Sequence, residues 1–114
     1  MKPPQRGELY WVNLDPVIGS EIAKTRPALI ISNDVGNQYA DRVIVAPISS
    51  GVLGKLYPFE VHLNPDEGGL AKASKILLDQ IRTLDKSRLG QQIGVLNAER
   101  MEEINRAIRI SLAV

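Results

Sequence analysis

Most of the chain up to residue 96 consists of short apolar runs separated by Gly, Pro, Asn and Asp. Such runs predict strands, here over residues 7–13, 28–32, 42–47, 59–63, 74–81 and 92–96. Residues 59–64 alternate between apolar and polar, which is typical of a strand with one wet face. Residues 28–31 and 43–46 are continuously apolar, so we expect them in central strands.

The pattern changes to a helical period after residue 96. Asn97 suits the N-cap position, and Glu99 lies where the first turn favours negative charge. Apolar residues then recur at helical spacing: Met101, Ile104, Ile108 and Leu112. The segment is therefore predicted to be an amphipathic helix of about four turns that closes one side of the sheet.

Several short strands followed by one helix, in a chain of 114 residues, predict a single domain over residues 1–114. The expected class is mainly β with a C-terminal helix (α+β), and so small a set of strands favours a compact barrel or half-barrel. A shorter helix is expected from Asp85 to Gly90, and a turn over residues 65–69.

Composition excludes several kinds of site. The chain has no cysteine and one histidine, His62, so it lacks a disulfide framework, a thiolate metal site and a paired-histidine acid and base. Its net charge of +1 is low for a nucleic-acid-binding domain, so RNA binding would need a local cluster of Arg and Lys. No apolar run approaches the ~20 residues that span a bilayer, and the N-terminus lacks a signal core. We expect a cytoplasmic protein without a membrane contact.

Arg26 stands between a polar loop and an apolar strand, and Pro27 follows it. Proline fixes its own φ and biases the preceding residue toward an extended backbone. A guanidinium held at a strand entrance is well placed to bind a phosphate through two parallel hydrogen bonds. On the residues alone, a surface salt bridge of Arg26, for example to Glu21, remains the alternative.

Seven motifs follow one another along the chain: residues 6–11 (RGELYW), 14–16 (LDP), 19–21 (GSE), 25–27 (Thr-Arg-Pro), 32–34 (SND), 47–50 (PISS) and 76–85 (ILLDQIRTLD). None of them is specific alone, but the ordered set resembles the MazF/PemK family of toxin endoribonucleases. The resemblance implies the small SH3-like barrel of the CcdB, MazF and PemK toxins.

The same resemblance implies a function and partners. It implies a toxin of a toxin–antitoxin system that cuts single-stranded RNA (mRNA) at a short sequence without a metal, a cofactor or the ribosome. The products would be a 2′,3′-cyclic phosphate and a 5′-hydroxyl. The implied partners are the RNA, a second copy of the chain in a homodimer, and a MazE-type antitoxin whose acidic segment occupies the RNA groove.

Two residues carry the implied catalysis, Arg26 and Ser49. Arg26 would stabilise charge on the scissile phosphate, because a guanidinium with a pKa above ~12 is a poor general acid. Ser49 stands where related sequences usually have threonine, and its hydroxyl would donate to the phosphate or position the 2′-hydroxyl. Ser50 is the alternative hydroxyl. Some PemK-type members have a histidine at position 20 and a basic residue at position 77; this chain keeps only their aspartate, Asp79.

The resemblance also implies a set of residues that contact RNA: Ser20, Glu21, Thr25, Ser50, Lys55, Asp79, Gln80 and Arg82. The Gln80 amide can read a base edge with both a donor and an acceptor, and Lys55 would attract the backbone. Two structural alternatives stay open. One is a solvated loop at residues 20–21, and the other is a purely structural network of Asp79, Arg82 and Asp85.

Two other functions remain open for this fold. The first is a non-enzymatic gyrase poison like CcdB, a family that uses a C-terminal tryptophan region; the only tryptophan here is Trp11. The second is an SH3-like module that binds RNA or peptide without catalysis.

Overall fold

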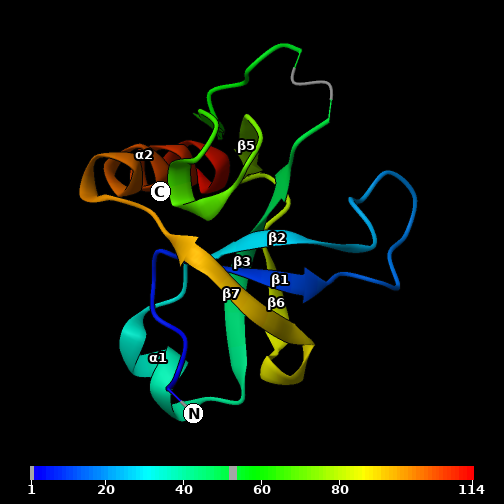
Figure 1. Cartoon of the computed structure of the whole chain (residues 1–114), viewed down its shortest axis with the longest axis vertical. Coiled ribbons are helices and arrows are strands. Elements are labelled where there is room, and N and C mark those ends of the chain that lie inside the picture. The colour runs from blue at the N-terminus through cyan, green and yellow to red at the C-terminus, as the bar shows by residue number, and fades with distance from the viewer. Residues whose placement is uncertain (1, 52–53) are drawn as a thin grey trace.

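The backbone forms one antiparallel sheet that is covered on one side by the C-terminal helix (Figure 1). The computed structural model describes residues 2–51 and 54–114. Its elements are β1 (Glu8–Asn13), β2 (Thr25–Ile30), α1 (Asp34–Tyr39), β3 (Arg42–Ser49), β4 (Glu60–Leu63), the 3₁₀ turn η1 (Glu67–Gly69), β5 (Ser74–Leu77), β6 (Arg82–Asp85), the 3₁₀ turn η2 (Lys86–Arg88), β7 (Leu89–Val95) and α2 (Ala98–Leu112).

The strands follow the order β4-β5-β3-β2-β1-β7, and β6 pairs with β3 beside this path. β3 is the central strand, because its residues 45–47 pair with β2, residues 42–45 with β6 and residues 48–49 with β5. The path ends at β4 and β7, so the sheet is an open barrel rather than a closed one. The predicted mainly β architecture with a C-terminal helix is confirmed.

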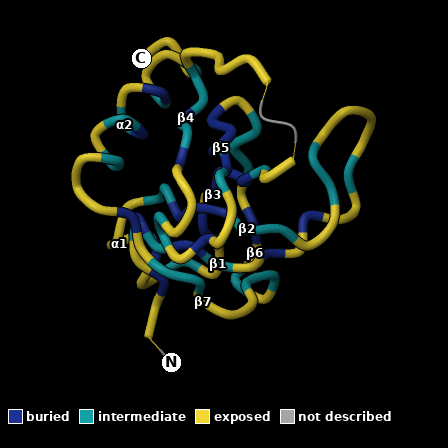
Figure 2. The backbone as a smooth tube through the Cα atoms, turned by 45° about the horizontal axis from the view of Figure 1, so that its top comes forward, coloured by how far each residue is buried: buried dark blue, intermediate teal, exposed yellow. Residues whose placement is uncertain are grey.

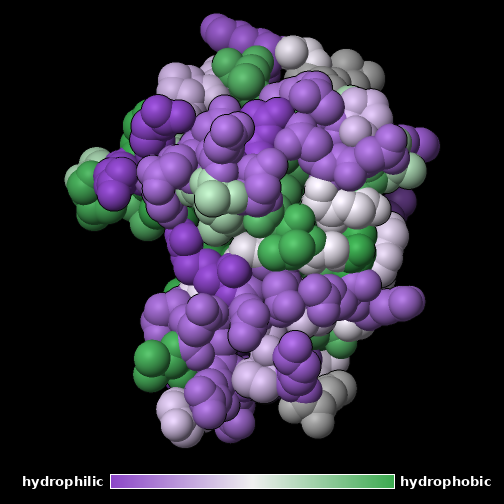
Figure 3. All heavy atoms as spheres, turned by 60° about the vertical axis from the view of Figure 1, so that its left-hand side comes forward, coloured by the Kyte–Doolittle hydropathy of each residue, from purple (hydrophilic) through white to green (hydrophobic). Residues whose placement is uncertain are grey.

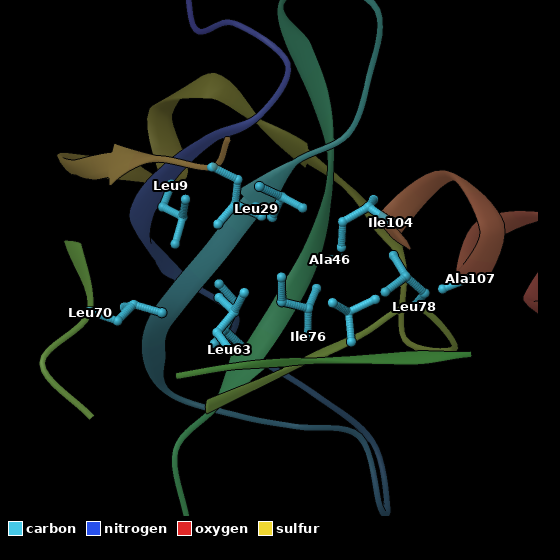
Figure 4. Close-up of a cluster of buried hydrophobic side chains, with 12 residues drawn as sticks. Leu9, Leu29, Ala46, Leu63, Leu70, Ile76, Leu78, Ile104 and Ala107 are labelled. Carbon is cyan, nitrogen blue, oxygen red and sulfur yellow. The ribbon is translucent and has the colours of Figure 1, made fainter. Parts of the chain in front are cut away.

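Buried residues lie mainly along the strands and on α2, while most residues in the connections between strands are partly or fully exposed (Figure 2). The first cluster lies between the sheet and α2, where Ile104 and Ala107 meet Leu29, Ala46 and Ile76 (Figure 4). The second cluster fills the other face: Val12, Leu14, Ala28, Ile30, Val43, Val45 and Leu84. Burial of these side chains is the main favourable term in folding.

The predicted C-terminal helix is confirmed, with one error in its apolar stripe. Asn97 is the N-cap, and its side chain accepts a hydrogen bond from the backbone N–H of Arg100 at 2.9 Å. Ile104 is fully buried, but Leu112 is 55% exposed and does not reach the core. The hydroxyl of Ser111 instead donates to the carbonyl oxygen of Leu78 at 2.7 Å.

Three other expectations differ from the structure. The predicted strand over residues 74–81 is two strands, β5 and β6, because the chain turns after Leu77. α1 was not expected; the side chain of Asn33 caps it by accepting a hydrogen bond from the N–H of Gly36. β2 and β7 start three residues earlier than expected, at Thr25 and Leu89. The short helix after Asp85 is present as η2.

The surface seen in Figure 3 is mostly hydrophilic, with separate hydrophobic areas. No helix in the described ranges, 2–51 and 54–114, is long and apolar enough to cross a membrane.

Candidate functional site

The long connection between β1 and β2 extends from the sheet and brings the chain to Arg26 (Figure 1). At its base, the N–H of Leu14 donates to the carbonyl oxygen of Lys24 at 3.0 Å, and the N–H of Lys24 donates to Asp15 Oδ1 at 2.9 Å. Farther out, the N–H of Ile22 donates to Oε1 of Gln80 at 2.8 Å. The connection is therefore fixed to the turn between β5 and β6.

This contact forms a cavity of about 450 Å³, here called the Gln80 cavity. It brings together five of the residues predicted to contact RNA: Ser20, Glu21, Asp79, Gln80 and Arg82. These residues come from two segments about 60 positions apart in the chain, so only the fold explains their proximity.

Several polar groups of the Gln80 cavity already have partners. Glu21 Oε1 accepts the N–H of Ile18 at 2.8 Å, and Arg82 Nη1 donates to the carbonyl oxygen of Leu14 at 2.8 Å. Within the described part of the chain, the hydrogen bond of the Gln80 side chain is made by its oxygen, which leaves its amide N–H groups for another acceptor. In residues 2–51 and 54–114 there is no ion pair between Asp79 and Arg82.

Arg26 is the second residue of β2 and is half-buried. Its Nε donates to the carbonyl oxygen of Ala23 at 2.8 Å. Among the residues that the structure describes, Nη1 and Nη2 have no hydrogen-bond partner, and Glu21 does not form an ion pair with this guanidinium. The stem of the side chain is therefore held, and two donors remain for an anion.

The pairing of β2 with β3 ends at Ala28 and Pro47. If its register is extended by two steps along the antiparallel strands, position 26 comes opposite position 49. Directly opposite residues share one face of a sheet. Val12, which pairs with Arg26, lies in the second cluster and identifies that face. The same count places Ser50 opposite Thr25 on the other face.

A larger cavity of about 600 Å³, here called the Arg26 cavity, opens beside these residues. Thr25, Arg26 and Ser50 line it, whereas Ser49 is not among its lining residues. Arg26 therefore borders both this cavity and the strand face that carries Ser49. A hydroxyl stands on each side, and the geometry leaves the choice between Ser49 and Ser50 to experiment.

The Arg26 cavity also contains residues to which the sequence assigned no role in RNA binding: Trp11, Lys24 and Lys72. Trp11 is 45% exposed, whereas its neighbour Tyr10 packs against the second cluster. Arg26 and the two lysines give the described lining three cations and no carboxylate. The signal available in the sequence for Lys24 was its place two residues before Arg26; none was available for Lys72, which is distant along the chain.

Lys55 lies in the connection between β3 and β4 and is not among the lining residues of either cavity. Its ammonium sits over the ring of Tyr57, 5.3 Å from the ring centre. That ring stacks in parallel on Phe59, with the ring centres 5.4 Å apart. Lys55 therefore has an aromatic partner that the low aromatic content did not suggest.

An ion pair with α2 holds η1, which forms part of the wall of the Arg26 cavity. Both side-chain oxygens of Glu67 accept hydrogen bonds from Arg100, at 2.7 and 2.8 Å. These bonds, followed by one from the backbone of Asn64, lower the pKa of Glu67 to about 2. Because Gly69 and Leu70, at the end of η1, line the Arg26 cavity, this ion pair connects α2 to the cavity wall.

The hydrogen bonds to Glu67 and Glu103 raise the pKa of Arg100. Apart from this ion pair, two groups have shifted pKa values. Burial, and then a hydrogen bond to Glu8, raises the pKa of Tyr10 to about 12. Bonds from the hydroxyl and backbone of Ser87 lower the pKa of Asp85, which caps η2. Asp85 thus has a structural role. Within the described ranges, no three potential metal-binding side chains of His, Asp or Glu lie together.

Comparison with known proteins identifies the family. Residues 5–112 match the model of the PemK-like, MazF-like toxin of type II toxin–antitoxin systems. The chain is 41% identical over 110 residues to endoribonuclease EndoA of Bacillus subtilis, covering 96% of this chain and 95% of that protein. It is 44% identical over 110 residues to endoribonuclease MazF of Staphylococcus saprophyticus, covering 96% of this chain and 92% of the relative.

Solved structures agree on the fold. A crystal structure of MazF from Deinococcus radiodurans superposes with a TM-score of 0.84 at 31% identity and full coverage of both chains. A mycobacterial endoribonuclease in complex with its cognate antitoxin superposes with a TM-score of 0.80 at 26% identity, covering 97% of this chain and 96% of that one. The fold of the MazF toxins, predicted from the motifs, is confirmed. The chain therefore belongs to the PemK-like, MazF-like toxin family of type II toxin–antitoxin systems.

Proposed function

We propose that this chain, acting as a single domain over residues 1–114, is a cytoplasmic toxin endoribonuclease. It cuts single-stranded RNA at a short sequence without a metal or the ribosome. The products carry a 2′,3′-cyclic phosphate and a 5′-hydroxyl. Unpaired RNA is the expected substrate, because the base edges of an A-form duplex lie in a deep groove that side chains do not read.

The observation that carries the proposal is the state of the Arg26 guanidinium. It is anchored through Nε, and its other two nitrogens are free of partners in the described chain. A donor that is already oriented stabilises a transition state without reorganising during the reaction. Lys24 and Lys72, in the lining of the same cavity, add positive charge where an RNA backbone would approach.

The proposed reaction is an internal transfer of the phosphate. The 2′-oxygen forms a bond to phosphorus, the bond from phosphorus to the 5′-oxygen breaks, and a proton passes from the 2′-hydroxyl to the leaving oxygen through a base and an acid. Arg26 holds the non-bridging oxygens, on which negative charge grows. The Ser49 hydroxyl donates to the phosphate or orients the 2′-hydroxyl. Arg26 acts through its charge and hydrogen bonds and is neither the acid nor the base.

The Gln80 cavity is the proposed site for base recognition. The Gln80 N–H groups and the outer carboxylate oxygen of Glu21 are the polar groups left over after the loop contacts. Asp79 and Ser20 are exposed at its edge, while Thr25 and Ser50 face the Arg26 cavity. Lys55 and the remaining guanidinium donors of Arg82 supply charge for the backbone.

The proposed assembly is a homodimer inhibited by a MazE-type antitoxin. Apolar side chains at the C-terminal end of the chain stay exposed, among them Ile110 at 54% and Leu112 at 55%, and a second copy would cover them. Relatives of known structure include complexes of MazE with MazF from Deinococcus radiodurans. An acidic, flexible antitoxin segment would compete with RNA for Arg26, because both ligands are polyanions.

The test uses purified protein and an end-labelled, unstructured RNA in the presence of EDTA. We expect discrete cuts in the wild-type reaction and a 2′,3′-cyclic phosphate at each new 3′ end. Arg26→Ala should cleave almost no RNA. Arg42→Ala is the matched control, because Arg42 is exposed at the opposite end of β3 from Ser49. Binding with intact RNA recovered would favour a non-catalytic module, and poisoning of gyrase without RNA cleavage would favour the CcdB-like activity.

A further inference from the structure

Lys75 lies directly beside the proposed catalytic hydroxyl. It pairs with Ser49 of β3 on one side and with His62 of β4 on the other. Residues directly opposite in a sheet share a face, with Cβ atoms about 5 Å apart. A lysine on this face is thus a close neighbour of the strand end that carries Ser49.

The Lys75 ammonium is held by two acceptors from the adjacent connection and strand. It forms an ion pair with Glu60 Oε1 at 3.1 Å, and it donates to the carbonyl oxygen of Lys55 at 3.5 Å. The side chains are only 15% exposed for Lys75 and 7% for Glu60. A largely buried ion pair adds little net stability over an apolar pair of similar size, so stability alone does not account for it.

Glu60 in turn binds the backbone of the connection between β3 and β4. The same oxygen, Oε1, accepts the backbone N–H of Tyr57 at 3.0 Å. Lys75 and Glu60 together therefore fix the backbone at two points, Lys55 and Tyr57. These are the two residues whose side chains meet as a cation over a ring.

The fixed segment presents groups that suit a nucleotide. The Tyr57 ring is 45% exposed and is backed by Phe59 in a parallel stack. An exposed ring supports a base regardless of its identity, and the neighbouring ammonium suits the phosphate attached to it. Holding both groups before the RNA arrives removes part of the ordering cost of binding.

We propose that Lys75 and Glu60 are positioning residues that hold Lys55 and Tyr57 ready to bind one nucleotide next to the cleavage site. This inference rests on the proposed endoribonuclease function. Neither residue touches the reacting atoms in this account. The expected consequence of losing the ion pair is weaker RNA binding at a nearly unchanged rate of the chemical step.

The central variant is Lys75→Met, which keeps the length of the side chain and removes its charge. We expect the Kd of a non-cleaved 2′-deoxy analogue of the RNA to rise about tenfold, the range of one lost stacking contact. Single-turnover cleavage at saturating protein should change less than about threefold, within the spread expected when only ground-state binding is lost. Lys75→Arg should restore binding, because it can again pair with Glu60. Lys2→Met, at the distant N-terminal end (Figure 1), removes the same charge and should leave the Kd unchanged.

A second measurement does not depend on cleavage. Amide hydrogen exchange at Tyr57 should become faster in Lys75→Met. Without the Lys75 ammonium, Glu60 is less well positioned to accept the hydrogen bond from the Tyr57 N–H. If Lys75→Met does not fold, Glu60→Gln takes its place, since the amide keeps an acceptor for Tyr57 but loses the ion pair.

The outcomes separate the two proposals. Wild-type protein that fails to cut RNA would end the proposed function, while the exchange measurement still tests the positioning role. Wild-type cleavage together with an unchanged Kd or unchanged Tyr57 exchange in Lys75→Met would overturn the positioning role alone. A large loss of single-turnover rate with normal binding would overturn it as well, since that result assigns Lys75 to the chemistry.

Discussion

Nε of Arg26 donates a hydrogen bond to the carbonyl oxygen of Ala23 at 2.8 Å. This one contact joins the proposed catalytic side chain to the loop that precedes its strand. The loop is fixed in turn by the bond between the Ile22 N–H and Gln80. Base recognition at the Gln80 cavity and charge stabilisation at Arg26 are therefore mechanically connected, and a change in one is expected to affect the other.

The hydroxyl partner of Arg26 can be identified by paired substitutions. Ser49→Ala should lower the single-turnover cleavage rate by about two orders of magnitude, the usual effect of losing one donor to a developing charge. Ser49→Thr should keep most of the activity, because it retains the hydroxyl. Ser50→Ala, one residue away, removes the alternative hydroxyl and should lower the single-turnover rate at saturating protein much less than Ser49→Ala. The reverse result, with Ser50→Ala inactive, would place the reactive phosphate on the cavity side of the strand.

Gly94 allows β7 to pass close to η1. A Cβ at this position would lie 2.3 Å from the carbonyl oxygen of Gly68, so the backbone would have to move. Gly94→Ala should therefore lower the free energy of unfolding in urea by about 1–3 kcal/mol, as for other overpacked sites. Gly51→Ala is the control, because a Cβ there meets no atom of the described residues within 4 Å. Equal stability of the two variants would contradict this account of the β7 approach.

The ion pair of Glu67 with Arg100 predicts a pH dependence of stability. The folded protein lowers the pKa of Glu67 from 4.5 to about 2, so the unfolded chain binds its proton more readily. The stabilisation is complete above about pH 4.5 and is lost as the pH falls toward about 2. Glu67→Gln should thus unfold with a weaker acid dependence than wild type over this interval.

The acid titration needs a carboxylate control from the same region. Glu102→Gln changes an exposed residue of α2 that forms no ion pair in the described chain, and it should keep the wild-type acid profile. At pH 7, Arg100→Ala should cost about 1–2 kcal/mol, because the bond is bidentate but partly open to solvent. An acid profile of Glu67→Gln that coincides with wild type would show that this carboxylate does not carry the effect.

Features that depend on neighbours in sequence were predictable. The start of α2 follows from Asn97, whose side chain caps the helix, and Ile104 follows from the helical period. The central place of β3 follows from its continuous apolar run, although Ile44 within it is 39% exposed. In each case the deciding interaction lies within a few residues, so the local pattern contains it.

Features that depend on distant partners were not predictable. Residues 74–81 contain no Gly or Pro that would mark a turn. However, β3 pairs with β5 at residues 48–49 and with β6 at residues 42–45. The chain must turn between these two edges. The sequence did not predict α1, because its six residues contain a glycine and show no helical repeat of apolar residues.

In the candidate site too, the sequence predicts individual residues but not the distant residues that they meet. The motifs point to Arg26 and Ser49, but their relative position depends on how β2 pairs with β3, a pairing that ends at Ala28 and Pro47. Lys72 belongs to the same cavity through a chain segment more than forty residues away, and the ion pair of Lys75 with Glu60 depends on the pairing of β4 with β5. A sequence pattern does not fix these registers.

The most direct test is single-turnover cleavage of one labelled RNA by wild type, Arg26→Lys and Arg26→Ala at equal, saturating protein. We predict a fall of about two to three orders of magnitude for Arg26→Ala. Arg26→Lys should lie between, because lysine restores the charge without the planar fork. Cleavage by Arg26→Ala at the wild-type rate and at the same positions would contradict the account.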